Sequence, residues 1–383
     1  MKKILTVLLC LLLTIPILTL EVSALAEEEI SAPSAVLIDV DSGKILFEKN
    51  KDEQRPCASI TKVMTLLLVM EALDSGKIHL DDIVTTSAHA SSMGGSDIWL
   101  EEGEQMTVDE MIKATAVASA NDAAVALAEH ICGSEDDFVT MMNERAKELG
   151  MDQTTFLNCN GLDEEGHLTS AYDVALMSRE LIKHNLIFDY TSIWLDSLRD
   201  GETQIVNTNK LLKTYPGITG LKTGTTSEAS SCISATAERD GLSLIAVVLG
   251  APSGKDRFKD AATLLDYGFA NFMTVKLDMS EELYPMAVEG GMEDDVDILC
   301  EDSAAVTVPK GEEGNVKQSV NLAESITAPV EKGQKVGTLS YTLGGETVAS
   351  FDVVTADSVE AMIFLTVLTK LYHAAVKLEA NDE

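Results

Sequence analysis

Three short strings of residues carry side chains that together could transfer an acyl group through a serine ester. Ser-Ile-Thr-Lys at 59–62 offers a hydroxyl and an amine, and Ser-Ala-Asn at 119–121 adds a second hydroxyl and a carboxamide. Lys-Thr-Gly at 222–224 contributes a cation, a hydroxyl and a residue without a side chain. Each string recurs by accident in proteins, but all three in this order predict one acyl-transfer site.

Ser59 and Lys62 are the candidate nucleophile and base. A serine hydroxyl needs a base to take its proton, and residues three positions apart share one face of a helix. Lys62 can be this base only as a neutral amine, so its pKa must fall from about 10.4 toward neutrality. Burial and a second cation, for which Lys222 is the candidate, both lower such a pKa. The alternative is that Ser59 caps the helix and Lys62 is an exposed lysine without a catalytic role. An unpaired charge is costly in this otherwise apolar helix, which argues against that alternative.

Ser119 and Asn121 stand where two predicted helices meet. The Ser119 hydroxyl could relay a proton between the lysine and the leaving amine, and Asn121 can hydrogen-bond both Lys62 and a substrate amide. The alternative is that either residue caps the helix that begins near Asp122. Capping and catalysis are compatible at this junction.

The third string is expected to lie on a strand. Lys222 offers a point charge for a terminal carboxylate, and Thr223 and Thr225 offer hydroxyls to the same group. Gly224 leaves room for a substrate backbone along the strand. The backbone N–H groups of Ser59 and Thr225 are the candidate oxyanion hole. Taken alone, the string is also typical of a strand end and turn.

Two other catalytic schemes have less support. No Gly-x-Ser-x-Gly pattern surrounds a serine, so His167 is expected to line or brace the cleft and not to form a triad. The cysteines after residue 26 are irregularly spaced and odd in number, which does not indicate a disulfide framework. No cysteines or histidines show paired ligand spacing, so we expect neither a metal nor another cofactor.

The segments around the strings predict an α/β (α+β) fold in which helices cover an antiparallel sheet. The helix after Ser59 is apolar on all sides, which is typical of a helix buried in a core. Asp240-Gly241 is a strong hairpin signal between two apolar runs. The expected elements are a hairpin at 35–48, helices within 59–73, 108–132, 169–185 and 255–272, and strands at 232–239 and 242–250.

The two ends of the chain differ from its centre. Residues 1–26 have the basic start, apolar stretch and Ala-Leu-Ala site of a signal peptide, with a retained anchor as the alternative. We expect a catalytic domain at 29–273 and a small β-rich domain at 274–356. Residues 358–383 are predicted to be an amphipathic helix that lies on a membrane surface or docks on its own domain.

The 383 residues carry a formal net charge of −35. This charge keeps the protein soluble and argues against binding to nucleic acid.

The quoted strings and their surroundings resemble the D-alanyl-D-alanine carboxypeptidases, the low-molecular-mass penicillin-binding proteins of serine peptidase family S11. The resemblance spans about 34–272 and includes CASITKVMT, ASANDAAVALAEHICGS, GLDEEGHLTSAYDVA and TGLKTGTT. It implies a β-lactamase/transpeptidase-like catalytic domain, a β-sandwich-like domain and a membrane anchor. The implied activity is removal of the terminal D-alanine from peptidoglycan stem pentapeptides outside the cytoplasm, with β-lactams as covalent inhibitors.

The resemblance also implies a role for each matching residue: Ser59 as the acylated nucleophile, Lys62 as the proton acceptor, Ser119 and Asn121 as the second active-site element, and Lys222 as the binder of the substrate carboxylate. Ala120 departs from the glycine or aspartate of many relatives. Ser-Glu-Ala-Ser-Ser at 227–231 replaces a usual Ala-Gly pair, which leaves the local strand geometry open.

Two rival functions remain at this point. A serine β-lactamase needs a carboxylate to activate the deacylating water, and the stretch 151–161 contains Asp152 but no glutamate. This difference favours slow release of β-lactams. A non-catalytic cell-wall-binding protein is the second rival, and the presence of both Ser59 and Lys62 argues against it.

Overall fold

The computed structural model describes most of the chain, namely residues 25–277, 283–300, 305–364 and 368–369. The expected signal peptide lies outside these residues except for its last two positions, and so does most of the expected helix at 358–383. The expected start of that helix is wrong, because Val359 and Ala361 form β-bridges and Val359 is buried in the core of the C-terminal domain. Within the described ranges, no helix is long and apolar enough to span a bilayer.

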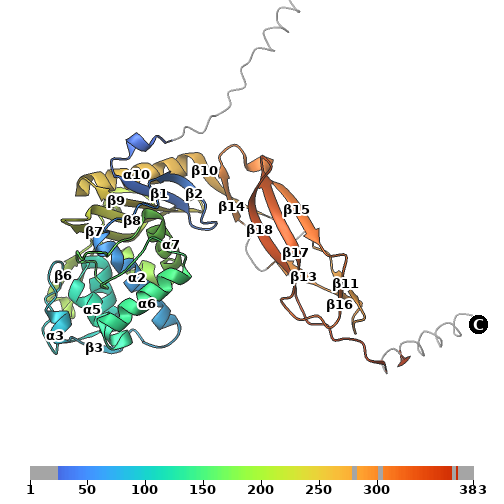
Figure 1. Ribbon diagram of the computed structural model, residues 1–383, viewed down its shortest axis with the longest axis horizontal. Helices are drawn as coiled ribbons and strands as arrows, with labels where there is room; N and C mark the ends of the chain where they lie inside the picture. The colour runs from blue at the N-terminus through green and yellow to red at the C-terminus, as the bar shows by residue number, and fades with distance from the viewer. Residues whose placement is uncertain (1–24, 278–282, 301–304, 365–367, 370–383) are drawn as a thin grey trace, which may run out of the picture.

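A five-stranded antiparallel sheet is the centre of the catalytic domain (Figure 1). It confirms the antiparallel sheet and both hairpins that the sequence predicts. Its strands, in spatial order, are β2 (Ile45–Lys49), β1 (Ser34–Asp39), β9 (Leu242–Ala251), β8 (Ser230–Arg239) and β7 (Ile218–Thr226).

Both faces of this sheet are covered. Successive side chains of a strand point to opposite faces, and alternate residues of β1 pack in two different cores. Val36 and Ile38 pack in the larger core, which also contains the central helix α2 (Lys62–Asp74). Ala35 and Leu37 pack on the opposite face with α10 (Gly254–Asn271). In Figure 1, α10 runs along one side of the sheet, and helices such as α2, α5, α6 and α7 lie on the other.

The helical part confirms the expectation of a helix buried all round. All residues of α2 from Lys62 to Met70 are buried. The other helices are α3 (Ala88–Ser91), α4 (Val108–Lys113), α5 (Asn121–Cys132), α6 (Glu135–Glu148), α7 (Ala171–Leu181), α8 (Phe188–Thr191) and α9 (Leu211–Thr214). Two small antiparallel strand pairs join this part, β3 (Ile83–Thr85) with β4 (Gln105–Thr107), and β5 (Leu195–Leu198) with β6 (Thr203–Val206).

The C-terminal part is an all-β domain that extends away from the catalytic sheet (Figure 1). Leu339, Tyr341 and Val353 are buried in a core of its own. Its strands are β10 (Phe272–Lys276), β11 (Met286–Glu289), β12 (Asp295–Val296), β13 (Ile298–Cys300), β14 (Ala305–Pro309), β15 (Lys317–Leu322), β16 (Ser325–Thr327), β17 (Lys335–Leu343) and β18 (Glu346–Thr355).

Candidate active site

Ser59 lies in a tight turn that leads into the central helix. The turn is a 3-10 helix, η2 (Ala58–Thr61), and the α-helix begins only at Lys62. The sequence predicted a helix within 59–73, and the α-helix begins three residues after the start of that range. The side chains still meet, because Lys62 Nζ lies 3.1 Å from Ser59 Oγ.

Two glycines press against the backbone of this turn. A Cβ on Gly161 would lie 2.0 Å from Ala58 O, and the φ of Gly161 is +86°. A Cβ on Gly224 would lie 2.6 Å from Cys57 O and 3.0 Å from Ser59 N. Gly224 was expected to leave room for a substrate backbone, and the structure adds a second reason for a glycine, since the backbone of Cys57 and Ser59 takes part of that room. The turn is therefore held between β7 and the loop at 158–162.

Lys62 makes three contacts through one nitrogen, which is buried. Nζ lies 2.6 Å from Asn121 Oδ1 and 2.6 Å from Asn160 O, in addition to Ser59 Oγ. Asn121 Nδ2 donates to Gly94 O at 2.6 Å, which orients the amide oxygen toward Lys62. Burial lowers the pKa of Lys62 to about 7. A large fraction of the amine is therefore neutral near physiological pH.

The two oxygen acceptors beside Lys62 Nζ determine which neighbour its lone pair faces. A neutral amine has two N–H donors and one lone pair, and the oxygens of Asn121 and Asn160 can only accept. Once these two oxygens take the two N–H groups, the lone pair is left for the Ser59 hydroxyl. The arrangement can therefore take a proton from Ser59 Oγ.

Ser119 and Lys222 form the second half of the site. Ser119 follows a π-helical turn, η3 (Ala114–Ala118), and its φ of +64° ends that turn. Lys222 Nζ donates to Ser119 Oγ at 2.8 Å and to Thr223 O at 3.0 Å. Burial and the charge of Lys62 hold the pKa of Lys222 well below its usual range. From the sequence, the lowered pKa of Lys62 was attributed partly to the charge of Lys222. In the structure burial is the main cause for Lys62, and charge repulsion between the two lysines lowers the pKa of Lys222 instead.

Two threonine hydroxyls of β7 and an arginine of α10 meet at the end of β7. Thr223 Oγ1 donates to Thr208 Oγ1 at 2.7 Å, so this hydroxyl is committed within the protein. Arg257, in the first turn of α10, donates to Gly224 O at 2.8 Å and to Thr225 Oγ1 at 2.7 Å. The guanidinium remains charged, so it adds positive charge at this strand end. The sequence analysis did not identify Arg257. Its position in the first turn of the helix that follows β9 is the signal that could have indicated a cation near the sheet.

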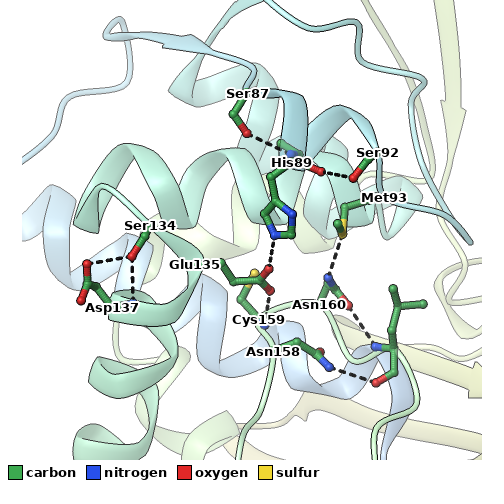
Figure 2. Close-up of polar contacts among 12 residues, drawn as sticks. Ser87, His89, Ser92, Met93, Ser134, Glu135, Asp137, Asn158, Cys159 and Asn160 are labelled. Carbon is green, nitrogen blue, oxygen red and sulfur yellow. Dashed lines mark hydrogen bonds and ion pairs between the residues drawn. The ribbon is translucent and has the colours of Figure 1, made fainter.

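The loop at 158–162 closes the site over Lys62, and sequence reasoning missed it because its contribution is a backbone carbonyl. Figure 2 shows how it is held. Glu135 accepts from the Cys159 N–H at 2.9 Å and lies 2.7 Å from His89 Nε2. Gly161 N donates to Asn158 Oδ1 at 2.7 Å. The carbonyl of Asn160 is thus fixed by contacts on both sides of it.

His167 braces this loop, as the sequence analysis expected. Its Nδ1 accepts from Leu157 N at 3.1 Å, so its Nε2 carries the proton and donates to Thr61 Oγ1 at 2.8 Å. Burial lowers the pKa of His167 to about 4. The ring is therefore neutral near physiological pH and links the nucleophile turn to the strand-like segment before the loop.

Comparison with known proteins gives a consistent result over the whole chain. The profile of the family described as D-alanyl-D-alanine carboxypeptidase (peptidase S11) matches residues 21–253. The profile described as penicillin-binding protein 5, C-terminal domain, matches residues 272–361. D-alanyl-D-alanine carboxypeptidase DacF of Bacillus subtilis is 43% identical over 383 residues, which cover 97% of this chain and 98% of that protein. DacC of Escherichia coli is 35% identical over 349 residues, 88% of this chain and 87% of that protein.

Solved structures give the same answer. Penicillin-binding protein 5 from Haemophilus influenzae has a TM-score of 0.79 and 33% identity, covering 88% of this chain and 100% of that one. Penicillin-binding protein D2 from Listeria monocytogenes, in its ampicillin-bound form, has a TM-score of 0.58 and 35% identity over 63% of this chain and 98% of that one. The chain thus belongs to the D-alanyl-D-alanine carboxypeptidases of peptidase family S11, which are penicillin-binding serine peptidases.

Proposed function

We propose that this enzyme removes the terminal D-alanine from the stem pentapeptides of peptidoglycan through an acyl-enzyme on Ser59. The observation that carries the proposal is the set of three contacts at Lys62 Nζ, which leaves a lone pair for the Ser59 hydroxyl. The family membership supports the activity, and the geometry supports the assignment of residues to it.

In the acylation step, Lys62 Nζ takes the proton of Ser59, and Oγ attacks the carbonyl carbon of the penultimate D-alanine. The N–H groups of Ser59 and Thr225 stabilise the oxyanion. The bond to the terminal D-alanine then breaks, and the proton held by Lys62 passes to the leaving nitrogen. Ser119 Oγ accepts from Lys222, so its own O–H is free to take part in this transfer.

In the second step, water attacks the ester. Lys62, neutral again, takes a proton from the water, and the oxygen attacks the acyl carbon. The ester C–O bond breaks, and Ser59 Oγ recovers its proton from Lys62. The products are D-alanine and a peptide shortened by one residue. A β-lactam follows the first step, and its covalent adduct on Ser59 blocks the second.

Substrate binding is assigned to the strand end beside the nucleophile. We place the terminal carboxylate of the substrate near Lys222, Thr225 and Arg257, with Thr223 and Gly224 shaping the strand. The substrate backbone then lies along β7. Arg257 is an additional carboxylate-binding residue that the three motifs do not contain.

We infer from residues 1–26 that the activity lies outside the cytoplasm. We propose that residues 1–26 direct export and are removed, and that 29–273 and 274–356 act as catalytic and β-rich domains. The later part of the expected 358–383 helix, beyond the β-bridges of Val359 and Ala361, is proposed to lie on the outer face of the cell membrane as an amphipathic helix. The acidic tail at 379–383 opposes electrostatic attraction to anionic lipids, so the apolar face of the helix must supply the binding free energy.

Mass spectrometry of a defined pentapeptide tests the activity. The wild-type enzyme is expected to release one D-alanine per peptide, and penicillin is expected to stop the release. Ser59→Ala should abolish both release and penicillin labelling, whereas Ser75→Ala, a serine at the end of α2, should retain both.

Two results contradict the proposal. Release of D-alanine by Ser59→Ala excludes Ser59 as the nucleophile. Rapid hydrolysis of penicillin by the wild type indicates the β-lactamase, because an enzyme inhibited by penicillin keeps its adduct.

A further inference from the structure

Trp99 stands out from the surface between two buried neighbours. Its side chain is 77% exposed, while Ile98 and Leu100 are 1% and 4% exposed. The φ of Trp99 is +55°. A bulky residue rarely adopts this left-handed conformation, and such conformations persist where the surrounding structure enforces them, often at functional sites.

Hydrogen bonds to both sides of Trp99 enforce its conformation. The N–H groups of Ile98 and Leu100 both donate to the buried carboxylate of Asp122, at 3.1 and 3.0 Å. Arg199 Nη2 donates to Ile98 O at 3.1 Å. The tryptophan is therefore presented on a fixed backbone, which reduces the entropy lost when a ligand binds.

Trp99 borders an open cleft of about 630 Å³ with a polar lining. Arg199 is fixed there by Glu104 at 2.6 Å and Thr203 at 2.9 Å. The remaining lining residues are Ile98, Glu101, Glu102 and Gly103. The cleft thus combines one aromatic face with carboxylate acceptors and a guanidinium donor.

The same loop reaches the candidate active site. Asn121 N donates to Ser96 O at 2.7 Å, and Asn121 Nδ2 donates to Gly94 O. Trp99 follows Ser96 by three residues, which limits the separation of their Cα atoms to about 11 Å. An extended peptide of four residues spans about 14 Å. A group attached to the far end of a stem peptide bound at Ser59 can therefore reach the cleft.

We propose that Trp99 and this cleft bind an amino-sugar unit of the glycan strand that carries the stem peptide. The inference rests on the proposed function, because the peptidase site supplies the attached peptide. The C–H face of a pyranose ring packs on an aromatic face, whose π-cloud is electron-rich. The sugar's hydroxyl and acetamido groups donate to Glu101 or Glu102 and accept from Arg199. The acidic lining disfavours an anionic lipid surface as the occupant.

The test compares one pentapeptide in two forms, free and attached to the N-acetylglucosamine–N-acetylmuramic acid disaccharide. We expect kcat/KM to be higher for the attached form, and Trp99→Ala to lower the ratio of the two values about tenfold, the scale of one aromatic contact. Trp99→Phe should keep part of the ratio. Ile83→Ala, which removes another exposed apolar side chain (52% exposed), should keep all of it. An unchanged ratio in Trp99→Ala, or an equal loss in Ile83→Ala, overturns the proposal.

A binding measurement separates this proposal from the peptidase activity. Titration of the wild type with the disaccharide alone, followed by tryptophan fluorescence, requires no turnover. We expect saturable quenching that Trp99→Ala loses and Trp99→Phe does not reproduce. Absence of quenching in an enzyme that releases D-alanine overturns the sugar site alone. Trp99-dependent binding to anionic vesicles with no response to the disaccharide overturns it in favour of a lipid surface.

Discussion

Glu135 Oε1 accepts a hydrogen bond from the backbone N–H of Cys159 at 2.9 Å, one residue before the carbonyl that faces Lys62. The carbonyl that contacts Lys62 is therefore positioned by α6, a helix that contributes nothing to the three sequence motifs. Burial raises the pKa of Glu135, but the hydrogen bonds from Cys159 and His89 outweigh it, so the pKa is lower than usual. The carboxylate stays ionised, and an ionised acceptor makes a stronger hydrogen bond.

We predict that Glu135→Ala slows acylation by penicillin about tenfold, because one charge-assisted hydrogen bond is worth roughly 1.5–3 kcal/mol and part of its loss reaches the base. Glu135→Gln should recover most of the rate, since its amide oxygen still accepts from the Cys159 N–H. Stopped-flow kinetics with a fluorescent penicillin measures both variants. Equal losses in the two variants, or a loss explained fully by a lower melting temperature, would contradict a positioning role.

The pKa of Lys62, lowered by burial to about 7, predicts an acid limb in the pH dependence of acylation. Below pH 7 the amine is protonated and has no lone pair for Ser59, so the rate should fall about tenfold per pH unit. Above pH 7 the rate should level off, since the base is then neutral. Acylation rates between pH 5 and 9 provide the test.

Lys62→Arg is the control for this assignment, because a guanidinium does not lose its proton in this range. It should acylate very slowly and without the limb near pH 7. An unchanged limb in this variant would assign the titration to another group. His167 is an unsuitable source, since burial lowers its pKa to about 4.

The motifs predicted which side chains lie together where these side chains meet within one element or across neighbouring ones. Ser59 and Lys62 share a turn, and an apolar helix around Lys62 already indicated the burial that lowers its pKa. The antiparallel sheet followed from local hairpin signals such as Asp240-Gly241. These features depend on short sequence distances, so spacing and residue type were sufficient.

The parts that the sequence did not reveal depend on contacts between distant segments. Asn160 acts through its carbonyl, which every residue has, so no residue type marks it. Glu135 and Arg257 are polar residues near helix N-termini, where such residues are common for other reasons. Only the packing of α6 on the loop and of α10 on the sheet distinguishes them. The 3-10 turn at Ser59 also depends on Gly161 and Gly224, which are remote in sequence.

Gly161→Ala should damage both stability and acylation. The new methyl group would lie 2.0 Å from Ala58 O, and the φ of +86° is unfavourable for alanine. We expect the free energy of unfolding to fall by roughly 3–5 kcal/mol. Denaturant unfolding and penicillin labelling measure the two effects.

Gly150→Ala is the matched control. Its φ of +73° is similar, but a Cβ there meets nothing within 4 Å, so the cost should be only about 1–2 kcal/mol. Similar losses in both variants would show that the backbone conformation dominates and that the close approach to the nucleophile turn has no separate effect.

Arg257 is expected to contribute more than Lys222 to the binding of the substrate carboxylate. Lys222 is 1% exposed, already bonded to Ser119 Oγ, and has a pKa well below its usual range. Arg257 is partly exposed, and although burial lowers its pKa too, a guanidinium keeps its charge. Arg257→Ala should therefore lower kcat/KM about 10- to 100-fold on a peptide that ends in a carboxylate.

The loss should be much smaller on the same peptide ending in an amide, and Arg257→Lys should recover part of the kcat/KM that is lost on the carboxylate peptide. Lys255→Ala, an exposed cation in the same helical turn, should change neither value, and equal losses on both peptides for Arg257→Ala would restrict Arg257 to supporting the strand through Gly224 O.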